Sequence, residues 1–481
     1  MKKNVLSKLG TVIVLSGLVF VMTIGLPKNA KAVPSFARQT GLACDVCHTV
    51  FPHLTPFGRN FKLHGYTIDY VDQIKSDDKS MPGLAINKVP MLSARLVARW
   101  NNQQGGNNGI VPRGIATGGQ GFVSYPSGYG DTDVLNLLAD SSIYVGGKIG
   151  PHIGTLIELT GINDEGGTLG LGIFDLAFVG SDTTFAGKTL SYGFRAVDTV
   201  GMADPSNTFG MWGLTSTLMG MSTHNTLLDT NTAFVEGGEL YGMWGDFTDG
   251  GLYACVGAYH PTKNQTLTGY VQGGVAGTGV FNGSSTVDPG VRVSYYLPEF
   301  NNVYVEIGGF GYFGNERMTQ PISSLVNPNY LDNYTNYGVD LQAQYLANNN
   351  LAELYVLYQS ENDSKFYGVD QYSGTSFSNS GTSVSRNGLG VMADYYYKRT
   401  YGAYVKYLST SSSQVSDMDV QSLVAGLSWY PYQNVNLLLE HSFFMKYNPG
   451  VAQYAALAQV PTSNISPSDF DVTAIKLEYL F

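Results

Sequence analysis

A period-two alternation of apolar and polar side chains, from about residue 89 to the C-terminus, constrains the fold of this chain more than any other feature. Residues 303–308, 352–357 and 474–481 each place apolar side chains at every second position. Such alternation is typical of β-strands with one apolar face, because successive side chains point to opposite sides of a strand. Gly, Ser, Thr, Asn and Tyr are abundant here, and no stretch has the pattern of a long helix. We therefore predict an all-β fold for most of the chain.

The lengths of the predicted connections distinguish a membrane barrel from a soluble all-β protein. Sixteen strands are predicted, beginning near residues 89, 133, 152, 170, 184, 232, 250, 289, 302, 334, 350, 386, 400, 419, 434 and 470. Tight turns at residues 150–151, 181–183, 247–250, 299–301, 348–350, 398–400 and 431–433 alternate with long loops such as 102–131, 199–231, 262–287, 315–333, 363–384 and 447–468. This alternation is typical of bacterial outer-membrane barrels, whereas the loop lengths of a soluble all-β protein need not alternate. The sequence predicts an antiparallel β-barrel of about 16 strands over residues 86–481, in the lipid of a Gram-negative outer membrane. The first strand should begin, and the last strand should end, on the periplasmic side.

Parity along the predicted strands assigns several carboxylates to the face opposite the apolar side chains, which is the lumen of a barrel. They are Glu158, Asp175, Glu306, Glu353, Glu440 and Glu478. Their oxygen atoms could attract cations into the lumen. The alternative is that they hydrogen-bond across the lumen, as ionisable groups do in barrels generally.

The N-terminus has the features of an export signal. Lys2, Lys3 and Lys8 precede an uncharged run from Leu9 to Leu26, and a small-x-small sequence follows at residues 30–32. We predict a cleaved signal peptide over residues 1–32, with an uncleaved membrane anchor as the alternative. Cleavage would remove five lysines and change the net charge from −10 to about −15. A chain this acidic is not expected to bind nucleic acid.

A C-x-x-C-H motif, Cys44-Asp45-Val46-Cys47-His48, follows the predicted cleavage site. This motif is the attachment sequence for c-type haem: each thiol forms a thioether with a vinyl group, and the histidine ligates the iron. We predict one covalently bound haem c, held by Cys44 and Cys47, with His48 as the proximal iron ligand. A thioredoxin-like pair or a zinc site fits less well, because neither a βαβ context nor a second ligand pair is present. The third cysteine, Cys255, is predicted to be a buried bystander in a strand.

Residues 33–85 are predicted to form a small, partly helical haem domain. A helix should begin at Thr55-Pro56 and end near Gly65, with Phe57, Phe61 and His64 on one face and Arg59 and Lys62 off that face. A segment of about fifty residues cannot bury much core, so covalent haem and packing inside something larger would supply the rest. The domain could sit in the barrel lumen as a plug or hang at the mouth of the barrel.

The distal ligand of the haem iron remains open among four residues. Met81, Met91, His53 and His64 are the candidates. A methionine thioether would raise the reduction potential, whereas a second histidine would favour a lower one.

Residues 33–66 carry a resemblance to a known family. Val33–Gly41, the C-x-x-C-H motif, Phe51-Pro52, Leu54–Arg59, Phe61–Leu63 and Gly65-Tyr66 are similar to the fused monohaem cytochrome–porins, the outer-membrane Fe(II) oxidases of iron-oxidising bacteria. The resemblance implies that extracellular Fe(II) donates one electron to the haem, and that a periplasmic cytochrome c or blue-copper protein accepts it. His53 and His64 stand where this family often has Glu and Asn, so the resemblance assigns neither of them as a ligand.

Two other functions are compatible with the sequence. The chain could be an extracellular electron conduit for a donor or acceptor other than iron. It could also be a transport porin whose haem-containing domain is a structural plug.

Overall fold

The computed structural model describes residues 34–67, 71–74, 86–103, 132–138, 141–160, 170–198, 204–208, 235–261, 287–317, 331–347, 349–366, 382–412, 419–448 and 466–481. The predicted signal peptide, Met81 and most of each predicted long loop lie outside these residues. The helices are α2 (Pro34–Thr40), α3 (Cys44–Cys47), α4 (Pro56–Leu63) and a 3-10 turn, η5 (Pro467–Phe470). The strands are β1 (Leu92–Gln103), β2 (Thr132–Asn136), β3 (Ser142–Gly150), β4 (Ile153–Thr160), β5 (Gly170–Val179), β6 (Thr183–Phe185), β7 (Lys188–Asp198), β8 (Val235–Gly245), β9 (Gly251–Pro261), β10 (Asp288–Tyr296), β11 (Val303–Arg317), β12 (Leu331–Leu346), β13 (Asn350–Phe366), β14 (Thr382–Tyr397), β15 (Tyr401–Ser412), β16 (Val420–Tyr432), β17 (Val435–Tyr447) and β18 (Val472–Leu480).

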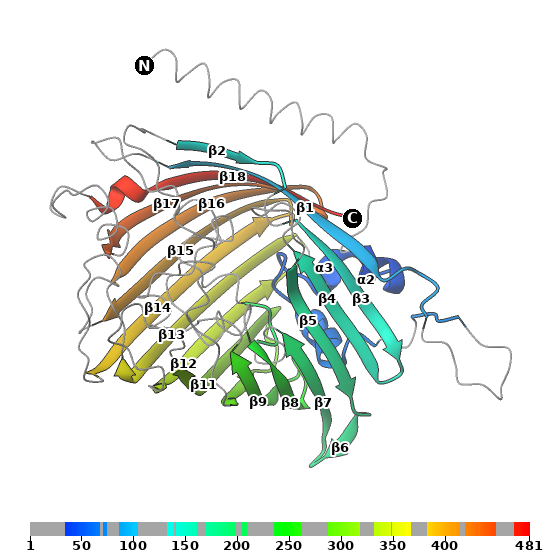
Figure 1. Cartoon of the computed structure of the whole chain (residues 1–481). Coiled ribbons are helices and arrows are strands. Elements are labelled where there is room, and N and C mark those ends of the chain that lie inside the picture. Colours follow the sequence, from blue (N-terminus) through cyan, green and yellow to red (C-terminus); the bar gives the residue numbers. More distant parts are fainter. Residues whose placement is uncertain are drawn as a thin grey trace.

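The strands close into a single antiparallel barrel (Figure 1). Strand β1 pairs with β18 on one side and with β3 on the other, which leaves no open sheet edge between the first and last strands. Strands β2 and β3 both pair with β1, and β5 and β6 both pair with β7. The eighteen strand segments therefore occupy sixteen positions around the barrel, and the predicted fold class is confirmed.

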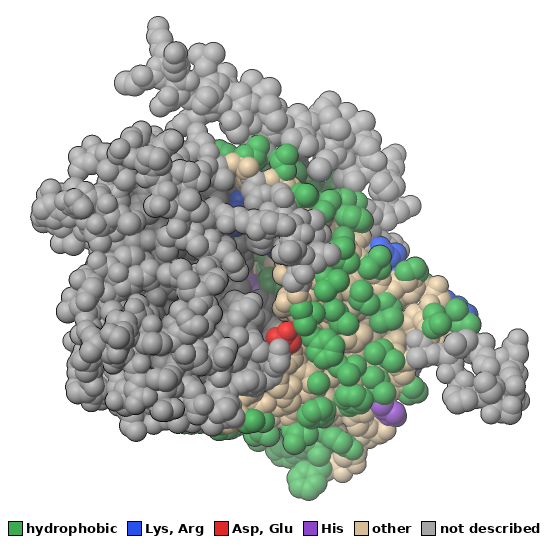
Figure 2. Space-filling model, viewed as in Figure 1, with side chains coloured by type: hydrophobic (Ala, Val, Ile, Leu, Met, Phe, Trp, Pro, Cys, Tyr) green, Lys and Arg blue, Asp and Glu red, His purple; other side chains and the backbone are tan. Residues whose placement is uncertain are grey.

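The wall of the barrel is apolar outside and polar inside. Val405 in β15 is 50% exposed, whereas its neighbour Lys406 is 2% exposed and faces the lumen. Figure 2 shows the apolar side chains spread over the visible outer wall. Beside the short turns, Tyr295 and Tyr395 also have exposed side chains. A closed barrel with this distribution has the features of a transmembrane barrel, whose outer surface contacts lipid.

The helical N-terminal segment, residues 34–67, lies inside the barrel. Helix α2 packs on β1 and β3, where Gln39 donates a hydrogen bond to the Gly146 carbonyl at 2.8 Å. On another side of the lumen, the Tyr241 hydroxyl of β8 donates to the Leu63 carbonyl at 2.7 Å. Of the two positions that the sequence left open, the segment therefore takes the one in the lumen. Among the described residues, no helix combines the length and the apolar character needed to cross a bilayer.

Helix α4 begins and ends as its sequence predicts. The Thr55 hydroxyl caps it by accepting from the Gly58 amide at 3.1 Å, and Pro56 occupies the first turn. At the other end, Gly65 has a φ of +60°, and its amide donates to the Lys62 carbonyl while the Tyr66 amide donates to the Phe61 carbonyl. This pattern is a Schellman motif, in which glycine adopts the left-handed conformation at little cost.

Burial in α4 does not follow the apolar face that carries Phe57, Phe61 and His64. Phe61 is buried, but Phe57 is 40% exposed, whereas Arg59 and Lys62 are 2% and 5% exposed. These polar side chains are buried because they meet hydrogen-bond acceptors: Arg59 donates to Gln344 of β12, and Lys62 donates to Asp204 and Asn207 in the segment 204–208. Apolar packing within residues 34–67 includes a small aromatic cluster in which Phe36 contacts Phe61 and Tyr66 at centroid distances of 5.2 and 5.1 Å. Leu63 packs instead against Tyr241 and Met243 of the barrel wall.

Candidate functional site

The C-x-x-C-H motif forms the short helix α3 and the residue after it. Cys44 and Cys47 are unbridged and partly exposed, and their spacing places both side chains on one side of a helical turn. The His48 amide donates to the Cys44 carbonyl at 2.8 Å. A Cβ atom added at Gly58 would lie 2.0 Å from the Cys47 carbonyl oxygen, so only glycine lets α4 pack this closely against the motif.

His48 presents one ring nitrogen and has the other one occupied. Its Nδ1 atom lies 3.3 Å from the Pro52 carbonyl oxygen and 3.2 Å from the His53 carbonyl oxygen, so Nδ1 must carry the proton and donate. Desolvation lowers the pKa of His48 to about 4, which keeps the imidazole neutral. In the described part of the chain, no hydrogen bond engages Nε2. A neutral imidazole held at Nδ1 by a carbonyl is the usual arrangement of a metal-ligating histidine. The residues present therefore fit a haem whose vinyl groups are bonded to the two thiols and whose iron is ligated by His48 Nε2.

The motif lies at the end of the barrel that carries the short turns. The Cys44 amide donates to the side chain of Gln433, in the β16–β17 turn, at 3.1 Å. Arg399, in the β14–β15 turn, donates to the Asp45 carbonyl at 3.0 Å. These contacts fix α3 against the rim of the barrel.

The candidate distal ligands differ in what surrounds them. His64 has both ring nitrogens engaged, Nδ1 with the Asn60 carbonyl at 2.8 Å and Nε2 with Asp182 at 3.1 Å. Met91 immediately precedes β1 and is half-buried. Met81 lies outside the described residues. His53 belongs to a separate buried cluster.

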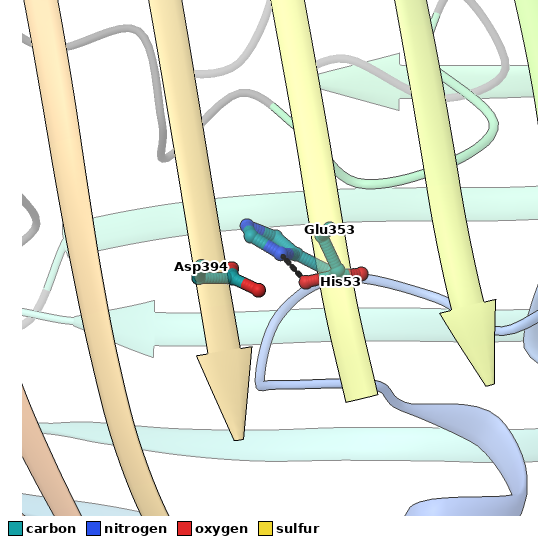
Figure 3. Close-up of side chains that lie close together, drawn as sticks. All are labelled: His53, Glu353 and Asp394. Carbon is teal, nitrogen blue, oxygen red and sulfur yellow. Dashed lines mark hydrogen bonds and ion pairs between the residues drawn. The ribbon is translucent and has the colours of Figure 1, made fainter. Parts of the chain in front are cut away.

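This cluster joins the loop after α3 to the barrel wall (Figure 3). His53 Nδ1 lies 3.0 Å from Glu353 Oε2 on β13, and Asp394 projects from the adjacent strand β14. The ligand atoms of the three residues all lie within 4.8 Å of one another, and the residues are 5%, 3% and 6% exposed. The sequence predicted that Glu353 faces the lumen and that His53 is a candidate ligand, but it gave no reason to join them or to name Asp394. The inward parity of Asp394 was the one signal available.

The other predicted lumenal carboxylates are inside the barrel and mostly paired. Asp175 accepts from Arg195 and from the Tyr66 hydroxyl, and Glu306 pairs with Arg292 at 2.8 Å. Glu440 and Glu478 are also buried, and the half-buried Glu158 accepts from Tyr144 at 2.7 Å. The parity prediction is therefore confirmed. Cys255 is buried among Tyr241, Met243 and Tyr253, as predicted for a bystander.

No sequence-family profile and no curated protein sequence matches the chain. Several solved outer-membrane proteins resemble it. The outer membrane channel DcaP of Acinetobacter baumannii aligns with a TM-score of 0.45 at 12% identity, over 85% of this chain and 100% of that one. OmpF of Salmonella typhi, in complex with daunomycin, gives 0.43 at 13% identity over 81% and 97% of the two chains. An anion-selective porin from Comamonas acidovorans gives 0.42 at 9% identity over 81% and 98%. The barrel assignment for this chain rests on its own strand pairings.

Proposed function

We propose that this chain is an outer-membrane cytochrome that oxidises extracellular Fe(II) and passes the electron to a periplasmic cytochrome c or blue-copper protein. The observation that carries the proposal is the geometry of His48, a neutral imidazole with Nδ1 occupied, beside two unbridged thiols within the lumen of a transmembrane barrel. The same proposal places the barrel in the outer membrane, which its apolar outer wall supports, and the short turns on the periplasmic side, where outer-membrane barrels usually have them.

The residues of the chain have distinct roles in this proposal. Cys44 and Cys47 would hold a single haem c as thioethers, and His48 would ligate its iron through Nε2. The carbonyls of Pro52 and His53 fix the orientation of the His48 ring by accepting from Nδ1. The bound haem would supply a one-electron redox couple. Because only one electron moves, the chain needs no acid–base pair or nucleophile.

The place of the motif suits transfer across the membrane. The motif contacts the short turns, which are the periplasmic turns in barrels of this kind, so a soluble carrier could approach it there. An extracellular ion would enter the polar lumen from the opposite end of the barrel. The barrel thereby offers a route through a lipid layer that otherwise insulates the donor from the acceptor.

Anaerobic addition of Fe(II) to the oxidised, membrane-extracted protein tests the proposal. We expect the haem absorption spectrum to show rapid reduction at a physiological pH, measured at both neutral and acid pH. A haem that dithionite reduces and Fe(II) leaves oxidised would overturn the iron assignment and favour a conduit for another redox partner. Absence of covalent haem would overturn the cytochrome assignment itself.

A transport porin is the second candidate function, because the closed sixteen-position barrel has a polar lumen. In that case, replacing Cys44 and Cys47 by serine would leave ion conductance intact or raise it, and no electron transfer would be lost. Under the cytochrome proposal, the wild type is reduced by Fe(II) and this variant loses that reduction together with its covalent haem.

A further inference from the structure

We infer that His53, Glu353 and Asp394 form a divalent-cation site in the lumen, beside the predicted haem attachment site. The existence of the site rests on the geometry of the three residues alone. The identity of its natural occupant, Fe(II), rests on the proposed function.

Asp394 is the residue that calls for a cation. It is 6% exposed, and neither of its carboxylate oxygens makes a well-formed hydrogen bond among the described residues, where the groups next to it are the side chain and the backbone of Glu353. Buried carboxylates are normally paired with a cation or hydrogen-bonded, because desolvation without compensation is costly. The charged group next to it is another carboxylate, Glu353, which repels it when both are ionised. A cation between the two carboxylates would compensate both.

The donor set suits a first-row divalent ion. One imidazole nitrogen and carboxylate oxygens together bind iron, manganese and zinc in proteins, with water in the remaining positions. Glu353 is also held in place. Its Oε1 atom accepts from the Tyr355 hydroxyl at 2.8 Å and from the Gln344 amide at 2.7 Å. Its Oε2 atom is hydrogen-bonded to His53 Nδ1 at 3.0 Å, and a bound cation would replace this contact. Hydrogen bonds of this kind, to the carboxylate oxygen that does not contact the metal, are typical of metal-binding sites in proteins.

The cluster is connected directly to the C-x-x-C-H motif. The backbone carbonyl of His53 accepts the hydrogen bond from His48 Nδ1 at 3.2 Å. A cation on the His53 side chain would therefore be separated from the His48 imidazole by one residue and one hydrogen bond. With Fe(II) in the site, one electron would leave the ion, which would become Fe(III), and the haem that His48 would ligate would accept this electron. The balance requires no proton and no further reactant.

Cation binding can be measured without any electron transfer by using Mn(II). The full-length, haem-loaded protein in detergent is titrated with Mn(II), and free Mn(II) is counted by its EPR signal. We expect the wild type to retain about one Mn(II) that Asp394→Asn does not retain. Asp340→Asn is the matched control, because Asp340 is a lumenal aspartate of β12 whose oxygens already bond to Arg292 at 2.7 and 2.8 Å. Equal binding by the wild type and Asp394→Asn, or no binding by the wild type, would overturn the site.

A second variant keeps the test valid if Asp394→Asn does not fold. Tyr355→Phe removes only the hydroxyl that supports Glu353, and we expect it to weaken Mn(II) binding by about tenfold or more. Unchanged affinity in Tyr355→Phe, with Glu353→Gln also unchanged, would contradict the assignment of Glu353 as a ligand.

Reduction of the haem by Fe(II) separates failure of the site from failure of the proposed function. We expect Asp394→Asn to be reduced more slowly than the wild type by Fe(II) and at the same rate by dithionite. If Fe(II) never reduces the wild type but Mn(II) binds as expected, the function fails and the cation site stands. If Fe(II) reduces the wild type and Asp394→Asn equally fast, the site has no part in the reaction and its assignment to Fe(II) is overturned.

Discussion

At the scale of single residues, Gly58 controls how closely α4 approaches the C-x-x-C-H helix. Replacing it by alanine would bring Cβ to 2.0 Å from the Cys47 carbonyl oxygen, which is backbone and cannot move aside as a flexible side chain would. We expect Gly58→Ala to lower the amount of covalent haem per folded barrel severalfold, measured by the pyridine haemochrome spectrum. Gly309→Ala in β11 is the control, because its nearest atom would lie 3.5 Å away. Equal haem content in both variants would contradict this steric requirement.

Lys62 gives a second prediction at this scale, concerning pH. Its ammonium group donates to the Asp204 carbonyl at 2.7 Å and to Asn207 at 2.8 Å, yet burial lowers its pKa from 10.5 to about 8. The unfolded chain therefore binds this proton more tightly than the folded chain does. The destabilisation is full below pH 8 and is relieved as the pH rises to 10.5, by about 3 kcal/mol in total.

The test compares urea unfolding of the wild type and Lys62→Met between pH 7 and 10.5. We expect the stability of the wild type to rise relative to that of Lys62→Met across this window, because methionine has no proton to lose. Parallel pH profiles of the two proteins would show that Lys62 keeps an ordinary pKa in the lumen.

The sequence predicted some of the site residues and not others. The C-x-x-C-H motif and the Thr55 cap are local patterns, so their geometry could be predicted from a few adjacent letters. The cluster of His53 with Glu353 could not, because 300 residues separate them in the sequence and only the barrel register brings them together. Nothing in the sequence fixed which strand faces the plug.

At the scale of elements, the apolar–polar pattern of the sequence predicts which side chains of the strands face inward, but it does not predict which side chains of α4 are buried. A strand of a membrane barrel has lipid on one side, so apolar parity identifies its outward face without knowledge of its neighbours. The helix has no lipid beside it. Arg59 is buried against an acceptor on β12, and Lys62 against acceptors in the segment 204–208. Helical periodicity therefore located α4 but did not indicate which of its side chains are buried.

Two adjacent positions in β15 test the outward face of a strand. Val405 is 50% exposed on the outer wall, and Lys406 is 2% exposed in the lumen. We expect Val405→Arg to destabilise folding into lipid vesicles by roughly 2–4 kcal/mol, measured from the urea midpoint, because the guanidinium would enter hydrocarbon. Lys406→Arg keeps a cation on the lumenal face and is expected to cost much less. A Val405→Arg midpoint equal to that of the wild type would place this position outside the membrane.

At the scale of the whole molecule, the plug is attached to several sides of the barrel at once. Helix α2 contacts β1 and β3, Leu63 accepts from β8, and His53 contacts β13. A segment anchored this widely should obstruct ion flow, even though the surrounding wall is polar. The obstruction is a property of the assembled molecule, since neither the plug sequence nor the strand sequences specify it separately.

Conductance in planar bilayers measures this obstruction. We expect the haem-loaded wild type to conduct weakly, and a variant lacking residues 34–67 to conduct several times more, provided that it still shows the heat-modifiable migration of a folded barrel. Cys44→Ser with Cys47→Ser should remain closer to the wild type, because the contacts from α2 and α4 to the wall do not involve the thiols. Equal conductance of the wild type and the deletion variant would show that the plug leaves an open path beside it. The polar lumen would then serve as a channel, and a transport porin would explain the molecule better than an electron-transfer protein would.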